Sequence, residues 1–153
     1  MGTVNKSIDV NVPLNVAYNQ WTQFEQYPQF MEHVERIEQL DDTHLRWHVR
    51  FGPISREFAA VVDEQHPDQR VAWHSTEGPT HAGVITFHRI DDDQTRVTAQ
   101  IDIDPEGVAE NIGDALNIVD TQVKGDMKRF KEFIEERGVA TGEWRGDIDP
   151  PQP

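Results

Sequence analysis

Cysteine is missing from this sequence of 153 residues. Its absence excludes disulfide bonds, thiolate nucleophiles and zinc sites built on cysteine, and it fits a reducing compartment. Long apolar runs are missing as well, since no stretch approaches the ~20 apolar residues that a membrane-spanning helix needs. The N-terminus "MGTVNKSIDVNV" has no basic segment followed by an apolar one, as a secretory signal would. We therefore expect a cytoplasmic protein without a membrane span.

Basic residues are few, because 14 Lys and Arg stand against 28 Asp and Glu, a formal net charge of −14. Such a surface repels nucleic-acid phosphates and anionic lipid headgroups, so no nucleic-acid partner is expected. The seven histidines show no metalloprotease-like spacing, and His44 and His48 on one strand would stand ~13 Å apart. We expect neither a metal site nor another cofactor.

Alternation of apolar and polar residues predicts seven strands. The stretch "HLRWHVRF" (44–51) has the clearest pattern, with apolar residues at every second position. The other strands are expected within residues 7–12, 33–40, 56–65, 70–77, 82–90 and 95–103. Short breaks rich in Gly, Pro or Asp separate the last six strands, which predicts an antiparallel meander.

Apolar residues recur at helical spacing in three further segments. Two short helices are expected after the first strand, one that starts behind Pro13 and one that runs from Pro28 towards the next strand. A long amphipathic helix of roughly 28 residues is expected from Val108 onward. Gly138 is a suitable stop for this helix.

The order of these elements limits how they can pack. The apolar face of the sheet must be covered, and the long C-terminal helix is the extended amphipathic partner available for it. We therefore predict an α+β fold in which the seven-stranded antiparallel sheet wraps round this helix and leaves a cavity between them. One domain is expected over residues 1–138, followed by an extended, partly disordered tail over residues 139–153.

Several segments resemble the polyketide cyclase/dehydrase branch of the START-like (SRPBCC) superfamily, and the resemblance covers residues 3–138. They are "IDVNVPLNVAYNQWTQFEQYPQFM", "VAWHSTEG", "AGVITFHRI", "TRVTAQIDIDPEG" and "GDMKRFKEFIEERG". The resemblance implies the helix-grip fold of START-like and Bet v 1-like proteins. The superfamily includes polyketide cyclases, coenzyme Q-binding proteins, lipid carriers, hormone receptors and co-chaperone domains, so the fold alone does not select an activity. No catalytic signature of the family can be carried over onto this sequence.

Strand alternation predicts which side chains face the cavity. His44, Arg46, His48 and Arg50 are expected on the solvated convex face, paired with acidic neighbours. The opposite face is expected to bind the ligand with aromatic residues, small residues that leave room beside them, and a few polar groups. The predicted ligand-binding residues are Trp47, Val49, Arg56, Phe58, Trp73, Ser75, Gly83, Ile85, Phe87, Ala99, Ile112, Leu116 and Val119.

Three functions are compatible with this layout. The favoured one is binding or carriage of a small apolar molecule, either aromatic and polyketide-like or isoprenoid and lipid-like, by a monomer or weak homodimer. A cyclase or dehydratase would use Arg56, but it also needs a general base inside the cavity, and the inward positions supply none in this interpretation. A co-chaperone-like interaction module is the third. Arg56 could instead form a surface ion pair, and Glu77 or His81 could stand at the mouth of the cavity.

Overall fold

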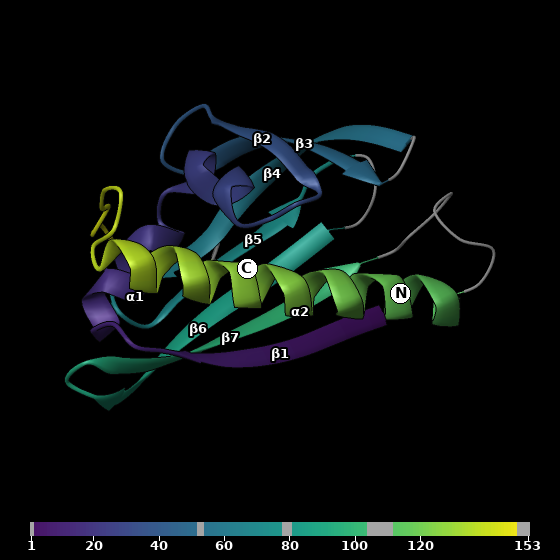
Figure 1. Cartoon of the computed structure of the whole chain (residues 1–153). Coiled ribbons are helices and arrows are strands. Elements are labelled where there is room, and N and C mark those ends of the chain that lie inside the picture. The colour runs from purple at the N-terminus through teal and green to yellow at the C-terminus, as the bar shows by residue number, and fades with distance from the viewer. Residues whose placement is uncertain (1, 52–53, 78–80, 104–111, 150–153) are drawn as a thin grey trace.

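The computed structural model describes residues 2–51, 54–77, 81–103 and 112–149. Its seven strands form one antiparallel sheet in the order β1-β7-β6-β5-β4-β3-β2, so the first two strands of the chain lie at the two edges. Figure 1 shows the sheet curving round the long helix α2, which confirms the predicted helix-grip architecture. The elements are β1 (Gly2–Val10), α1 (Leu14–Trp21), η1 (Phe24–Gln29), β2 (Val34–Gln39), β3 (His44–Phe51), β4 (Ile54–His66), β5 (Arg70–Ser75), β6 (His81–Asp91), β7 (Gln94–Ile103) and α2 (Ile112–Arg137).

The side chains of β3 follow the predicted alternation. Leu45, Trp47 and Val49 are buried on the concave side, whereas His44 and Arg50 are exposed. A strand places successive side chains on opposite faces of the sheet. One face of this strand therefore belongs to the core and the other to the solvent.

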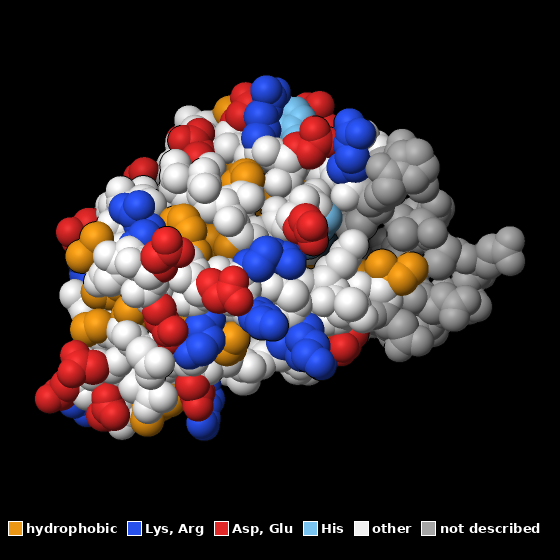
Figure 2. Space-filling model, viewed as in Figure 1, with side chains coloured by type: hydrophobic (Ala, Val, Ile, Leu, Met, Phe, Trp, Pro, Cys, Tyr) orange, Lys and Arg blue, Asp and Glu red, His pale blue; other side chains and the backbone are white. Residues whose placement is uncertain are grey.

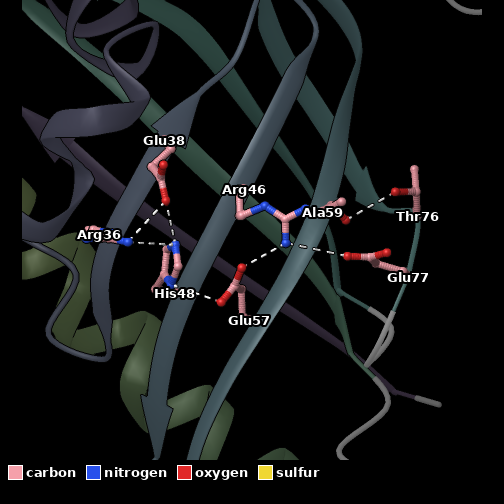
Figure 3. A network of polar contacts seen from close by, with 8 residues as sticks. All are labelled: Arg36, Glu38, Arg46, His48, Glu57, Ala59, Thr76 and Glu77. Atoms are coloured by element: carbon pink, nitrogen blue, oxygen red, sulfur yellow. Dashed lines mark hydrogen bonds and ion pairs between the residues drawn. The ribbon is translucent and has the colours of Figure 1, made fainter.

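The outward side chains of β3 belong to a polar network on the convex face, across β2, β3 and β4 (Figure 3). His48 Nε2 lies 2.8 Å from Glu38 Oε1, and Arg46 Nη1 donates a hydrogen bond to Glu57 Oε1 at 2.8 Å. Exposed pairs of this kind each contribute little to stability. The convex face is a solvated surface of paired charges, as the alternation predicts.

The helix α2 covers the concave face of the sheet with an apolar stripe. Val123, Met127, Phe130 and Ile134 follow one another at steps of three and four residues, and all four are buried. This spacing keeps them on one side of the helix. The opposite side of α2 is exposed and carries charges of both signs, which Figure 2 shows on the face where α2 lies in Figure 1.

The end of α2 lies where the sequence predicts it. The helix ends at Arg137, and Gly138 follows with a φ of +73° and donates its backbone N–H to Ile134 O at 2.8 Å. Glycine adopts this left-handed conformation without the steric cost that a side chain would bring. At the other end, the predicted start at Val108 lies outside the described residues, and the described helix begins at Ile112.

The second short helix differs from its prediction. A short helix running from Pro28 towards the next strand is expected, but η1 is a 3₁₀ helix of six residues that begins at Phe24 and ends at Gln29. Phe24 and Tyr27 of η1 and Phe30 directly after it are spaced by three positions, and all three are buried. A 3₁₀ helix has three residues per turn, so this spacing turns the three rings towards the same side.

The described part of the C-terminal tail lies against α1 and β4. Thr141 N donates to Gln20 Oε1 at 2.9 Å, and Gln20 Nε2 donates back to Thr141 Oγ1 at 3.0 Å. Further along, Ile148 and Gln65 exchange two backbone hydrogen bonds of 2.8 and 2.9 Å, as an isolated antiparallel bridge. Residues 139–149 are extended but held on the domain, and the domain boundary at residue 138 stays a prediction.

Two isoleucines of α2 provide a test of how this helix docks. Ile134 is fully buried and Ile118 is 43% exposed. We expect Ile134→Ala to lower the free energy of unfolding by roughly 2–5 kcal/mol, because a buried side chain is lost and a cavity remains. The matched change Ile118→Ala should cost well under 1 kcal/mol. Urea denaturation measures both values, and similar midpoints for the two variants would contradict the docking of α2.

Candidate functional site: an aromatic cavity under the terminal helix

A small cavity lies between the concave face of the sheet and α2. Its volume is about 30 Å³, which is room for about two water molecules. The walls are mainly apolar, with four polar side chains among them. The lining residues are Trp21, Met31, His33, Trp47, Trp73, His81, Ile85, Ala99, Ile101, Val119, Gln122, Val123, Asp126 and Met127.

Stacked rings from neighbouring strands form one wall of this cavity. Trp47 of β3 lies between Phe58 of β4 and Trp73 of β5, with ring centroids 5.8 and 5.5 Å away and interplanar angles of 14° and 27°. The strand register sets this arrangement, because Trp47 and Phe58 are directly opposed. His81 of β6 extends the wall, with its ring 5.1 Å from that of Trp47.

Gly83 accommodates this wall and does not open space for a ligand. A Cβ atom at Gly83 would lie 2.5 Å from Cζ2 of Trp73, its cross-strand neighbour. The indole ring therefore occupies the place that a side chain would take. The expectation that Gly83 leaves room beside the aromatic residues is wrong, because the large neighbour fills that room. Ser75 also has a local role, since its Oγ accepts a hydrogen bond from His81 N at 3.0 Å.

The structure divides the predicted binding residues into groups. Arg56 does not face the cavity: its side chain is exposed and Nη1 donates to Ser55 O. It stands opposite Val49 near the end of the β3–β4 hairpin, where a long side chain reaches the solvent.

The side chains of Ile112 and Leu116 lie outside the described residues. Those that line the cavity are Trp47, Trp73, Ile85, Ala99 and Val119, and those buried in the core without lining it are Val49, Phe58 and Phe87.

Polar residues that the sequence interpretation missed lie at one end of the cavity. Asp126 of α2 is 4% exposed, and its Oδ2 lies 3.7 Å from Nδ1 of His33. Arg129 donates a hydrogen bond to Oδ1 of the same carboxylate at 2.5 Å. The sequence does contain a signal for Asp126 by itself, because this residue lies three positions after Val123 and therefore within the apolar stripe of α2.

These buried groups have shifted pKa values. Burial raises the pKa of Asp126 to about 6, although Arg129 opposes the rise. Burial lowers the pKa of His33 to about 4, helped by the positive charge of Arg129, and it lowers the pKa of His81 to about 4 as well. At neutral pH the cavity therefore holds a carboxylate and two uncharged imidazole rings. An acid with a raised pKa beside a base with a lowered one can hold or move a proton.

Hydrogen bonding assigns the tautomer of His81. Trp73 Nε1 donates to His81 Nδ1 at 3.3 Å, so Nδ1 accepts and the neutral ring carries its proton on Nε2. No three His, Asp or Glu side chains in the described part of the chain are arranged to hold a metal ion. Among the described helices, none combines the length and the apolar character needed to cross a membrane.

Residues 10–132 match the protein family described as polyketide cyclase / dehydrase and lipid transport. The chain belongs to this family. One relative with a similar sequence is an uncharacterized 17.2 kDa protein in the melC2-rnhH intergenic region of Streptomyces lincolnensis. It is 54% identical over 149 residues, which are 97% of this chain and 99% of the relative. The resemblance noted in the sequence is therefore confirmed.

Solved structures share the helix-grip fold at much lower identity. The Zhui aromatase/cyclase of Streptomyces sp. R1128 superposes with a TM-score of 0.76 at 14% identity, covering 94% of this chain and 99% of that one. DR_A0006 of Deinococcus radiodurans gives 0.71 at 22% identity, covering 89% and 99%. A START superfamily protein of Mycobacterium smegmatis gives 0.70 at 14% identity, covering 88% and 95%. At these identities the structures establish the fold.

The raised pKa of Asp126 leads to a prediction for this family member. Folding raises the pKa from 3.8 to about 6, so the folded state binds a proton that the unfolded state releases between these values. The free energy of unfolding therefore falls by up to roughly 3 kcal/mol in total as the pH rises from about 4 to just above 6, and it stays at the lower level at higher pH. Asp126→Asn, which mimics the neutral acid, should gain stability relative to the wild type between pH 4.5 and 7.5.

Chemical denaturation at a series of pH values measures this difference. Titration of His81 affects both proteins and largely cancels in the comparison, and the pKa of His33, at about 4, lies below this pH range. The same change at the partly exposed Asp120 of α2, which pairs with Lys6 at 3.1 Å, reports the effect of removing a surface carboxylate from this helix. A stability difference between Asp126→Asn and wild type that stays constant with pH would contradict the assigned pKa.

Proposed function

We propose that this protein binds or carries a small, ring-bearing apolar molecule in the cavity between the sheet and α2. The observation that supports this best is that three of the four tryptophans line one cavity between the sheet and α2. Protein interiors are close-packed, and apolar walls with a few polar groups are typical of ligand sites. Membership of the family supports a hydrophobic-ligand-binding or cyclase function.

The cavity has to enlarge to take such a ligand. Its volume of about 30 Å³ is well below the ~300–1,000 Å³ of ordinary ligand pockets. Two flexible side chains, Met31 and Met127, stand on its walls, and methionine re-packs readily because it is unbranched. A planar ring system that slides against the stacked wall of Trp47 and Trp73 would need the least displacement. This favours an aromatic ligand over a long isoprenoid or lipid chain.

A cyclase- or dehydratase-type reaction is the second candidate function. The pair of His33 and Asp126 supports it, because these groups reach the cavity and their pKa values are shifted in opposite directions. The exposed position of Arg56 argues against the route through that residue which the sequence suggests. No observation favours a co-chaperone role. The large exposed apolar side chains of the described residues come from four separate places in the chain, namely Leu40 after β2, Ile90 in β6, Ile118 in α2 and Val139 after α2.

The binding proposal can be tested with N-phenyl-1-naphthylamine, an uncharged apolar fluorescent probe. We expect saturable binding of one probe per chain, with energy transfer from the cavity tryptophans. Ala99→Val adds two methyl groups to the cavity wall. The resulting overpacking costs about 1–3 kcal/mol, so the affinity for the probe should fall roughly five- to hundredfold. The matched change Ala59→Val on the half-buried outer side of β4 should leave probe affinity within about twofold.

Thermal unfolding of both variants would verify that they are folded. Loss of binding in Ala99→Val alone is the expected result. Absence of saturable binding in the wild type, or equal affinities in wild type and a folded Ala99→Val, would overturn the proposal.

A further inference from the structure

Two hydrogen-bond donors in the cavity wall are left without an acceptor. The indole Nε1 atoms of Trp21 and Trp47 are buried, and neither has a hydrogen-bond partner among the described residues. The third tryptophan of the wall differs, since Trp73 Nε1 donates to His81 Nδ1. A buried donor without a partner costs free energy, and native structures satisfy nearly all of them. These two N–H groups therefore call for an acceptor that the described residues do not supply.

Both unpartnered side chains border the space in which a ligand would lie. Trp21 comes from the end of α1 and Trp47 from the middle of β3, and each ring lines the same cavity. The rings are also fixed in place: Trp21 lies 5.1 Å from the ring of Tyr27, and Trp47 is stacked between two other rings. Rigid donors on the walls of one small cavity can recognise a single acceptor atom of a ligand.

The charge of the cavity selects the kind of acceptor. The ionised group on its wall is the carboxylate of Asp126, and the two imidazoles beside it are neutral at pH 7. Arg129 is already bound to that carboxylate and to Phe30 O, and it lies partly in solvent. A second carboxylate would enter an apolar, negatively charged space and lose its hydration, which is strongly unfavourable. An uncharged oxygen carries no such penalty.

We propose that Trp21 and Trp47 donate their indole N–H groups to a neutral oxygen of the ligand, so that the site selects ring compounds bearing a carbonyl or phenol oxygen. Hydrocarbons, unsubstituted isoprenoid chains and fatty acids then bind more weakly than oxygen-bearing ring compounds of similar size. This inference rests on the proposed function, because it concerns the ligand of the same cavity. Without a ligand, water molecules can occupy the space and accept these bonds. A ligand oxygen replaces water, whereas a hydrocarbon removes the water and leaves the donors unpaired.

Two compounds of the same shape separate the effect of the oxygen from that of the ring. Tetralin (1,2,3,4-tetrahydronaphthalene) is a hydrocarbon, and 1-tetralone carries one carbonyl on the same skeleton. Their dissociation constants, measured by calorimetry, give an affinity ratio for each protein variant. Trp47→Phe and Trp21→Phe each keep an aromatic ring and remove the N–H. We expect the preference for tetralone over tetralin to fall about three- to tenfold in at least one of them, the range of one neutral hydrogen bond.

Trp73→Phe is the matched control, because it shortens a ring of the same wall whose N–H already has a partner in the protein. Trp73→Phe should weaken the binding of tetralin and of tetralone by similar factors, so that the ratio of the two affinities is preserved. The anionic analogue 1,2,3,4-tetrahydronaphthalene-1-carboxylate tests the charge argument and should bind at least tenfold more weakly than tetralone. One further measurement, by NMR, needs only the wild-type protein and therefore remains available if a variant does not fold. The indole Nε1–H proton resonances of Trp21 and Trp47 should move downfield with tetralone and not with tetralin.

The outcomes distinguish this inference from the proposed function. Saturable binding of neither tetralin nor tetralone would overturn the proposed function itself. Binding of both, with an affinity ratio that is the same in wild type, Trp21→Phe and Trp47→Phe, would overturn the oxygen recognition and leave the apolar cavity standing. Tightest binding of the carboxylate would also overturn it. A ratio that falls in an indole variant but not in Trp73→Phe supports it.

Discussion

The cover that α2 provides for the concave face of the sheet is the constraint on which the rest of this structure depends. Near its C-terminal end the helix closes the core tightly, since Phe130 lies 5.1 Å from the ring of Trp21 and 5.2 Å from that of Phe30. Further towards its N-terminus, Val119 and Val123 border the cavity instead. One helix therefore seals the domain and forms a wall of the site, so that stability and ligand access involve the same element.

Asp126 lies on α2 between the tightly packed Phe130 and the cavity-lining Val123. Burying its carboxylate is unfavourable unless the group has partners. Arg129 supplies one partner from the solvent side, and His33 lies on the other side at 3.7 Å. Histidines in the cavity differ from those on the convex face. There His48 pairs with Glu38 in solvent (Figure 3), whereas His81 inside the cavity is held uncharged by burial and bonds to an indole.

Family membership and the cavity answer different questions. The helix-grip fold persists among structures that are only 14–22% identical to this chain, and one scaffold can carry unrelated activities. What a member binds depends on the side chains that line its own cavity. In this chain they are stacked indoles, flexible methionines and a polar end with one carboxylate, and this lining favours a flat, uncharged ring compound.

The strands, the long helix and the face to which each side chain of β3 points can be predicted from sequence patterns alone, because periods of two and of three to four are local properties of the backbone. Tertiary structure decided what each inward position does. Gly83 faces the core as predicted, but the indole of Trp73 occupies its space. Arg56 stands opposite the inward-facing Val49 in the strand register, yet it lies near the end of a hairpin and its side chain reaches the solvent. The grouping of His33 with Asp126 was beyond sequence reasoning, because it brings together residues 93 positions apart that meet only once α2 packs across the sheet.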